Sequence, residues 1–388
     1  MKVDLKVLKA TNDLFLRLCN LRRWTSFVSE DKYNELAKQG LNNIVTYILA
    51  VYSEKSGRTV HWERFPKIAL YRAFQKAYVY FDTPEHILNE ICCIGNISKS
   101  VFYDVTKEII VENTNKEFAE FLYEGIGTDE LKIYRAAIKI ATYIELMENR
   151  NKIDPVEFGV KTQQISESLE EFKNMPGVSE ISNPKGSIFQ ALEKISTLRN
   201  KNRWSVQTYL VECPVLGHLF DTAMFAYFMS LEENHEDEIL ASKMFFMGIF
   251  HDVAETWTTD IPSPIKDRIP SFRAATEEYE RRMLIQELYN VVPKFLATKL
   301  QEAMFEDETN VEFKRLIKGA DYLSADSECW RQYIAGCRDK YFLEAMNKRL
   351  EKINLGEVLL TPACKELYNY FVEYAEKLNL WHVKIRGM

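Results

Sequence analysis

The sequence predicts an all-α protein, and three observations support this fold class. Long segments rich in Leu, Ile, Phe, Tyr, Glu and Lys place their apolar residues at helical spacing. Only 14 glycines and 11 prolines interrupt the 388 residues. The sequence also lacks a convincing series of alternating strands joined by hairpin turns. Helices packed on helices are therefore the expected architecture.

The first half is expected to form helices with one apolar face. These helices are predicted at Asp13 to Arg23, Leu41 to Tyr52, Ile68 to Tyr80, Thr106 to Glu124 and Asp129 to Asn149. The pattern weakens after Arg150, where one helix-like piece, Thr162 to Phe172, precedes a segment rich in turn residues. We therefore predict two tandem domains, residues 1–175 and 176–388.

Helical patterning resumes at Ser187 and continues through the second half. The main expected helices are His218 to Ser230, Glu236 to Thr256, Ala274 to Tyr289, Pro293 to Phe305, Asn310 to Tyr322, Leu343 to Ile353 and Ala363 to Leu378. The chain contains 23 Phe and 20 Tyr, and core packing explains most of this aromatic content.

The composition is that of an ordinary soluble protein, with 46% hydrophobic and 28% charged residues. A formal charge of −7 provides no general basic surface, so duplex nucleic acid is not an expected partner. No apolar run approaches the roughly 20 residues that span a bilayer, so no membrane association is expected. Seven scattered cysteines without a C-x-x-C motif or a signal peptide favour a cytoplasmic location.

Several segments of the first half recur in the second half at a nearly constant offset, which indicates an internal duplication. The matched pairs include Arg23-Trp24 with Arg203-Trp204, Gln75-Lys76 with His251-Asp252, and Thr142 with Asp321. The first copy also has no histidine around Gln39 to Leu41, the region that corresponds to His218. A lysine in place of a carboxylate repels a cation, so the first half is expected to be a degenerate copy without a metal site.

The strongest local signal is the segment from Phe250 to Lys266. His251, Asp252 and Glu255 follow an apolar run, and on a helix His251 and Glu255 share a face. Asp260 follows, just before two prolines that should end the helix. A buried helix face seldom carries two carboxylates and an imidazole unless they are paired or bind a metal. A capped, salt-bridged helix end is the alternative.

Over roughly residues 187–327 the second half resembles the HD-domain metal-dependent phosphohydrolases, and most closely the bacterial 5′-deoxynucleotidases of the YfbR type. The resemblance is carried by N-R-W at 202–204, G-H at 217–218, H-D-V-A-E at 251–255, T-D-I-P-S-P-I-K at 259–266 and A-D-Y-L-S-A at 320–325. It implies that four residues bind one divalent ion: His218, His251, Asp252 and Asp321. Leu219, and Thr258-Thr259, depart from the usual family pattern without removing a ligand.

The chemistry of this residue set agrees with a metal site. Two imidazoles and two carboxylates suit Mn²⁺, Fe²⁺, Co²⁺, Mg²⁺ or a similar ion and leave positions open for water and substrate. Taken alone, His218 would be a core histidine and Asp321 a capping or salt-bridging residue. The other four histidines lie outside any such cluster and are expected at the surface or in packing contacts.

Roles for the remaining site residues are expected from the chemistry of the reaction or from the resemblance. Glu255 is expected to orient or deprotonate the attacking water, and Asp260 to protonate the leaving sugar oxygen or bind the sugar hydroxyl. Arg203 offers a planar fork for phosphate oxygens, although a surface ion pair is its alternative. By resemblance, Trp204 lies against the sugar and disfavours a 2′-hydroxyl, whereas core packing is its alternative. Lys266 either adds charge at the site entrance or is a solvated surface lysine.

The expected reaction is hydrolysis of deoxyribonucleoside 5′-monophosphates to deoxynucleoside and phosphate. A deoxynucleoside triphosphate triphosphohydrolase ranks second, because it needs more cations than this region offers, and a cyclic-nucleotide or signalling-nucleotide phosphodiesterase ranks third. A non-catalytic nucleotide sensor or scaffold is the alternative from another class, but it would need neither Glu255 nor Asp260. The first half could act as a homodimer interface, a lid or an allosteric nucleotide pocket.

Overall fold

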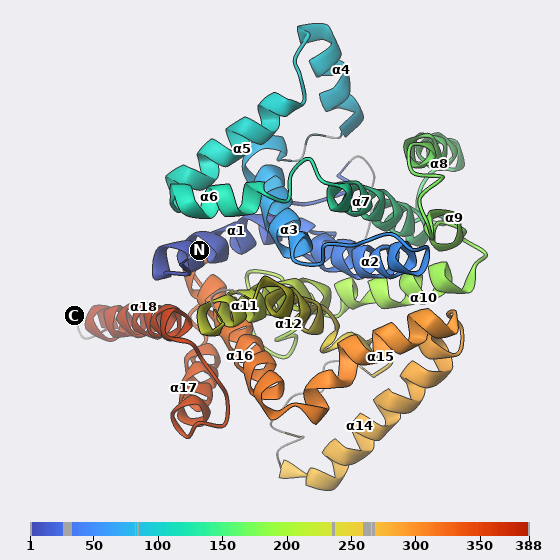
Figure 1. Cartoon of the computed structure of the whole chain (residues 1–388). Coiled ribbons are helices and arrows are strands. Elements are labelled where there is room, and N and C mark those ends of the chain that lie inside the picture. The colour runs from blue at the N-terminus through green and yellow to red at the C-terminus, as the bar shows by residue number, and fades with distance from the viewer. Residues whose placement is uncertain are drawn as a thin grey trace.

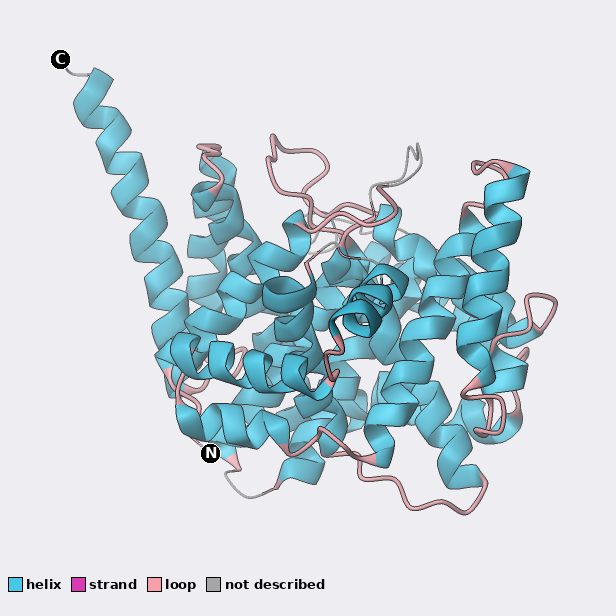
Figure 2. Ribbon diagram, turned by 90° about the horizontal axis from the view of Figure 1, so that it is seen from above, coloured by secondary structure: helices cyan, strands magenta, loops and turns pink. Residues whose placement is uncertain are grey.

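The computed structural model describes residues 2–25, 33–81, 83, 85–234, 237–258, 265 and 268–386. Within these ranges the chain is helical and has no β-strand, which confirms the all-α prediction (Figure 2). Two isolated antiparallel bridges join Arg22 to Asn34 and Asn202 to Pro214. No described helix combines the length and the apolar character needed to cross a bilayer.

The helices of the first half follow the predicted order, but several start earlier than predicted, and α4 and the short α9 were not expected. They are α1 Leu5–Asn20, α2 Glu35–Lys55, α3 Arg64–Gln75, α4 Glu85–Gly95, α5 Ser100–Asn113, α6 Lys116–Tyr123, α7 Asp129–Glu148, α8 Pro155–Glu170 and α9 Val178–Ile181. The expected helix from Thr106 to Glu124 is broken, because the Asn115 side chain caps α6 by accepting the Phe118 N–H at 2.8 Å. Helix α4 was not expected, although Ile87, Ile91 and Ile94 follow helical spacing.

The second half contains the predicted helices with changed ends. They are α10 Ser187–Ser196, α11 Val215–Glu233, α12 Glu238–Phe250, α14 Pro270–Leu284, α15 Lys294–Thr309, α16 Val311–Ile334, α17 Lys340–Asn354 and α18 Pro362–Arg386. The expected helix from Glu236 to Thr256 was too long: α12 ends at Phe250, and a separate 3₁₀ turn spans Val253–Thr256. The last expected helices also extend further than predicted, and α18 reaches beyond the rest of the molecule (Figure 2).

Helices α2 and α11 form the centre of the molecule, and both are buried over most of their length (Figure 1). They pack closely because Gly40 of α2 lies against the backbone of Leu216 at the start of α11. Residues of both halves contribute to one continuous apolar core. The division into two domains, residues 1–175 and 176–388, stays a prediction.

Replacing Gly40 by alanine should destabilise the contact between the halves. An added Cβ would lie 2.0 Å from the Leu216 carbonyl oxygen, so one helix must shift. We expect a loss of about 1–3 kcal/mol in the free energy of unfolding, measured by urea denaturation. Gly159→Ala on α8 is the matched control, because nothing lies within 4 Å of its added Cβ and helix propensity favours alanine. Equal stability of the two variants would contradict close packing at Gly40.

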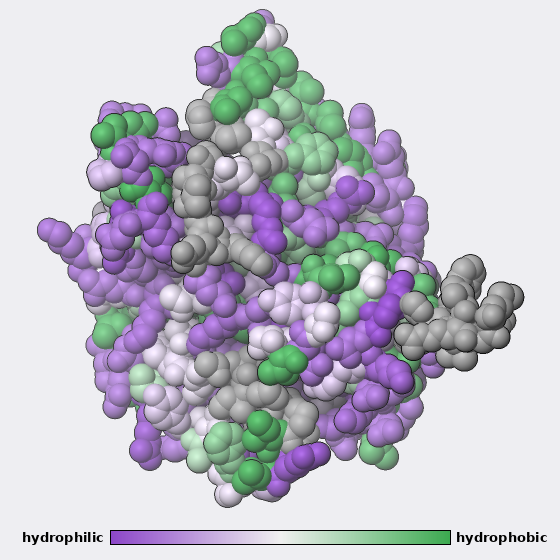
Figure 3. All heavy atoms as spheres, turned by 180° about the vertical axis from the view of Figure 1, so that it is seen from behind, coloured by the Kyte–Doolittle hydropathy of each residue, from purple (hydrophilic) through white to green (hydrophobic). Residues whose placement is uncertain are grey.

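Apolar side chains also gather outside the core, on the projecting hairpin of α4 and α5 (Figure 3). Ile94 is 82% exposed and Ile91 50%, and Val101 and Val105 continue this surface on α5. Contiguous apolar surface of this kind is typical of interaction sites. The homodimer nevertheless stays a prediction.

Candidate metal centre

The four predicted metal ligands come together from three helices. His218 lies in the first turn of α11, His251 and Asp252 follow the end of α12, and Asp321 lies within α16. One ligand atom from each residue can be chosen such that all four lie within 4.8 Å of one another. Residues more than a hundred positions apart in sequence thus form one compact donor set.

The donor atoms face one another across a small space. Nε2 of His218 lies 3.2 Å from Oδ1 of Asp321 and 4.0 Å from Oδ2 of Asp252. Nε2 of His251 lies 3.2 Å from the same Asp252 oxygen. The His218 side chain is fully buried whereas that of Asp252 is 29% exposed, so the donor set opens to solvent on the Asp252 side.

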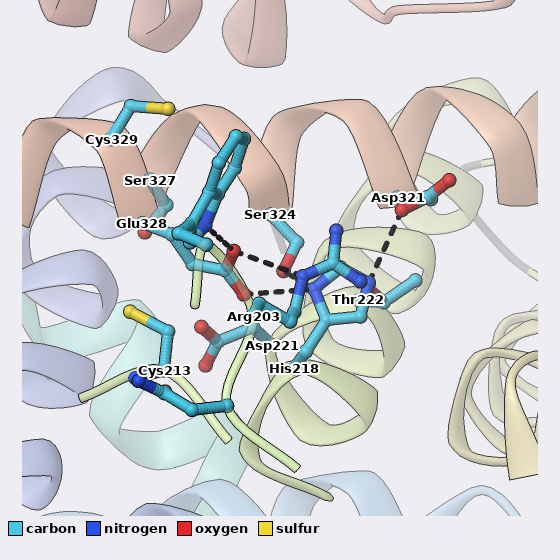
Figure 4. A network of polar contacts seen from close by, with 12 residues as sticks. Arg203, Cys213, His218, Asp221, Thr222, Asp321, Ser324, Ser327, Glu328 and Cys329 are labelled. Carbon is cyan, nitrogen blue, oxygen red and sulfur yellow. Dashed lines mark hydrogen bonds and ion pairs between the residues drawn. The ribbon is translucent and has the colours of Figure 1, made fainter. Parts of the chain in front are cut away.

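Both imidazole rings are held through Nδ1. The Nδ1 atom of His251 lies 2.7 Å from the Gly248 carbonyl oxygen, which can only accept, so Nδ1 carries the proton. The Nδ1 atom of His218 lies 3.1 Å from Oε1 of Glu328 and 2.8 Å from Oγ of Ser324 (Figure 4). Each Nε2 therefore points toward the carboxylates. A fixed Nδ1 partner is the usual arrangement of a metal-binding histidine.

The charges of the site favour a bound cation. Burial opposes ionisation of both aspartates, but His251 lowers the pKa of Asp252, and Lys318 with His218 lowers that of Asp321 well below its usual value. Burial and the Arg203 charge oppose protonation of His218, yet Glu328 and Asp321 raise its pKa to about 9, so without an ion Nε2 carries a proton that a bound cation would replace. Two ionised carboxylates beside two imidazole nitrogens fit a divalent ion of the Mn²⁺, Fe²⁺, Co²⁺ or Mg²⁺ type.

Glu255 does not occupy the position that a continuous helix would give it. Because α12 ends at Phe250, His251 and Glu255 do not share one helix face, and this part of the prediction was wrong. Glu255 instead lies in the 3₁₀ turn, where its N–H donates to the Asp252 carbonyl oxygen at 3.1 Å. Its side chain is buried just beyond the ligand pair.

Arg203 and Trp204 lie on a turn beside the donor set. The bridge between Asn202 and Pro214 fixes this turn, and Trp204 adopts a φ of 63° that non-glycine residues seldom use. Nη1 of Arg203 lies 3.9 Å from Oδ2 of Asp252, which places the guanidinium at the border of the metal centre. The indole of Trp204 packs edge-on against Phe342 of α17, with ring centroids 5.6 Å apart.

Two residues of this region were not recognised in the sequence. Glu328 contacts His218, Arg203 and Trp204, and Lys318 lies 2.5 Å from Oδ2 of Asp321. A glutamate follows the matched segments in each half, Glu145 and Glu328, but its distance from those segments differs between the halves, so this signal was not recognised. Asp260 and Lys266, both predicted as site residues, lie outside the described residues.

The first half repeats part of this arrangement without the ligands. Trp24 also has a positive φ, of 58°, beside the bridge between Arg22 and Asn34. Matching this bridge to the one between Asn202 and Pro214 places Lys38 opposite His218. The side chains of Arg23 and Trp24 donate to Glu145 at 2.9 and 3.0 Å, as the second-half pair does to Glu328. Matching these glutamates places Ile138, and not Thr142, opposite Asp321.

Comparisons with known proteins match the region of the chain that contains this site. A family model described as 5′-deoxynucleotidase YfbR-like matches residues 190–374. Proteins named 5′-deoxynucleotidase from Yersinia pestis (strain Pestoides F) and Yersinia pseudotuberculosis serotype O:1b (strain IP 31758) are each 28% identical over 160 residues, which is 41% of this chain and 79% of the relative. The matched region contains all four predicted ligands together with Arg203 and Trp204. Residues 190–374 of this chain are thus similar to the YfbR-like 5′-deoxynucleotidases.

Proposed function

We propose that the second half hydrolyses deoxyribonucleoside 5′-monophosphates to deoxynucleoside and phosphate with the help of one divalent ion. The observation that carries this proposal is the donor set of His218, His251, Asp252 and Asp321, which lies directly beside Arg203. The names of the Yersinia relatives support the choice of substrate.

The four donor residues would hold the ion. When bound, such an ion lowers the pKa of water and neutralises charge on phosphoryl oxygens. Lys318 donates to Oδ2 of Asp321 at 2.5 Å and so holds this carboxylate with its Oδ1 toward His218. The chain thereby fixes the ligand geometry before substrate arrives.

Arg203 is proposed to bind the phosphate group, because its guanidinium borders the donor set and a planar fork suits phosphate oxygens. Trp204, held by the same turn, is proposed to lie against the sugar and to disfavour a 2′-hydroxyl. Glu255 is proposed to orient the attacking water and accept its proton. Asp260 and Lys266 keep the roles proposed from the sequence, at the leaving oxygen and the site entrance.

A phosphate-release assay on metal-stripped protein, with Mn²⁺, Co²⁺ or Mg²⁺ added back, tests this function. The substrates are deoxyribonucleoside and ribonucleoside monophosphates, and one deoxynucleoside triphosphate scored for triphosphate release. Metal-dependent turnover confined to the deoxy monophosphates is the expected result. Triphosphate release alone would replace the proposal by a triphosphohydrolase, and metal binding without any turnover would replace it by a nucleotide sensor.

We also propose that the first half is a metal-free copy in which the Lys38 ammonium takes the place of the ion. Its Nζ lies 3.8 Å from Oε2 of Glu145 and donates to the Thr142 hydroxyl. Burial and the Arg23 charge lower the pKa of Lys38 to about 7, although Glu145 and Glu35 oppose this shift. Lys38 therefore carries its full positive charge only below about pH 7, where the ammonium would replace the ion without coordination chemistry.

The variant Lys38→Met should therefore lower stability and leave metal content unchanged. We expect a loss of about 1–3 kcal/mol in urea denaturation, because Glu145 loses one cation but keeps Arg23 and Arg199. Lys132→Met on α7 is the control, since its side chain is 63% exposed and should change stability little. A change in bound metal per chain in Lys38→Met would contradict the proposal that the first half binds none.

A further inference from the structure

Glu328 is a buried carboxylate to which the proposed reaction assigns no role. It lies two turns after Asp321 on α16, and its side chain is 1% exposed. Its Oε1 faces Nδ1 of His218 at 3.1 Å, and its Oε2 accepts from Nε of Arg203 at 3.1 Å and from Nε1 of Trp204 at 2.7 Å. Figure 4 shows Glu328 and Asp321 on opposite sides of the His218 ring.

The donors around Glu328 fix the direction of these hydrogen bonds. Nε of Arg203 and Nε1 of Trp204 can only donate, so Oε2 is their acceptor, and the guanidinium pairs with the carboxylate. Oε1 of this paired carboxylate is then the acceptor for Nδ1 of His218. Nε2 of His218, 3.2 Å from Oδ1 of Asp321, is then the ring atom that faces the metal ligands.

The first half contains a glutamate, Glu145, that makes only one of the two kinds of contact that Glu328 makes. Glu145 accepts from Arg23 and Trp24 through Oε2, as Glu328 does from Arg203 and Trp204. Its Oε1 accepts from Arg199 at 2.8 Å, whereas the same oxygen of Glu328 faces a histidine. The glutamate thus holds the arginine–tryptophan pair in both halves, and only in the second half does it also contact a metal ligand.

We propose that Glu328 is a positioning residue that holds the metal ligand His218 and the substrate-binding pair Arg203 and Trp204 in fixed relative positions. One oxygen sets the tautomer of His218, and the other orients both side chains that meet the nucleotide. Glu328 itself need touch neither the ion nor the substrate. This inference rests on the proposed function, in which His218 binds the ion and Arg203 and Trp204 bind the nucleotide.

The test compares Glu328→Gln with the unaltered full-length chain. The amide of glutamine has only one acceptor oxygen. Either Nδ1 of His218, or Arg203 and Trp204 together, therefore lose the oxygen that accepts from them. We expect the affinity for Mn²⁺ to fall about 10–100-fold, as is usual when the hydrogen-bond partner of a ligating histidine is lost. We also expect KM for a deoxy monophosphate to rise and the ratio of deoxy to ribo kcat/KM to fall several-fold, with a smaller loss in kcat at saturating metal and substrate.

Two further variants keep the test decisive. Glu328→Asp retains the charge and should recover part of the Mn²⁺ affinity that Glu328→Gln loses. Glu145→Gln removes the equivalent carboxylate of the first half and should lower stability without changing Mn²⁺ affinity or the deoxy preference. If Glu328→Gln does not fold, Glu328→Asp alone must still weaken Mn²⁺ binding relative to the unaltered chain.

Wild-type Mn²⁺ affinity and wild-type deoxy preference in Glu328→Gln, or in Glu328→Asp where only that variant folds, would overturn the inference. Equal effects of Glu328→Gln and Glu145→Gln on both readouts would also overturn it, because they would indicate a purely structural role. If the unaltered chain hydrolyses no nucleotide, the proposed function is wrong, but this result does not by itself decide the role of Glu328. The Mn²⁺ measurement then still decides whether Glu328 positions His218.

Discussion

The variant Asp321→Asn is expected to lose its divalent ion and to release phosphate at least about 10³-fold more slowly than the unaltered chain, because several kcal/mol of transition-state stabilisation disappear with the ion. Asp321 is the only predicted ligand on α16, and its Oδ1 lies 3.2 Å from Nε2 of His218. Asparagine keeps the size of the side chain but removes the negative charge that a divalent ion requires. Metal per chain after gel filtration, together with phosphate release, measures both effects.

Asp129→Asn is the matched control for this variant. It makes the same chemical change at the start of α7, where the side chain is 85% exposed and pairs with the neighbouring Lys132. Its metal content and turnover should equal those of the unaltered chain. Circular dichroism would show that both variants keep their helices. If Asp321→Asn retained one ion per chain and normal turnover, the metal site would have to lie elsewhere.

Glu255→Gln should slow turnover about 10²–10⁴-fold while metal content stays normal, because general base catalysis contributes that much and Glu255 is not among the four donors. Glutamine has nearly the same shape, so the buried 3₁₀ turn can keep its packing. The measurement pairs kcat for a deoxyribonucleoside monophosphate with metal per chain. This pattern separates an enzyme from a nucleotide sensor, in which Glu255→Gln should change little.

Glu277→Gln on α14 controls for the loss of one carboxylate, since Glu277 is exposed and lies outside the site. It should leave kcat unchanged. A normal kcat in Glu255→Gln would mean that another group takes the proton of the attacking water. Loss of the ion together with turnover would instead make Glu255 part of the support of the ligand pair.

The two halves share local features around the proposed metal site, as the predicted duplication would require. Both halves keep a bridge, a tryptophan with positive φ and a buried glutamate that binds the arginine–tryptophan pair. Lys38 stands where the second half has His218, and Ile138 where it has Asp321. Similar local contacts thus surround the proposed metal site in the second half and a buried lysine in the first half.

The sequence was sufficient for the helical fold class and for predicting that His218, His251, Asp252 and Asp321 lie together. Helical spacing of apolar residues is a local property of the chain, so most helices could be located before their packing was known. His218, His251, Asp252 and Asp321 each lie in a short motif of neighbouring residues, and such motifs can be compared with a known family before the structure is known. The structure then brings these four residues together as predicted.

Only the tertiary structure decided where the helices end and what supports the ligands. The end of α12 at Phe250 moves Glu255 off the face of His251, and no local pattern distinguished this end from a longer helix. The contacts of Glu328 with His218 and Arg203 join residues more than a hundred positions apart. Such contacts depend on how α11, α16 and the turn at Asn202 pack together, and a hydrogen bond between distant residues leaves no periodic trace in the sequence.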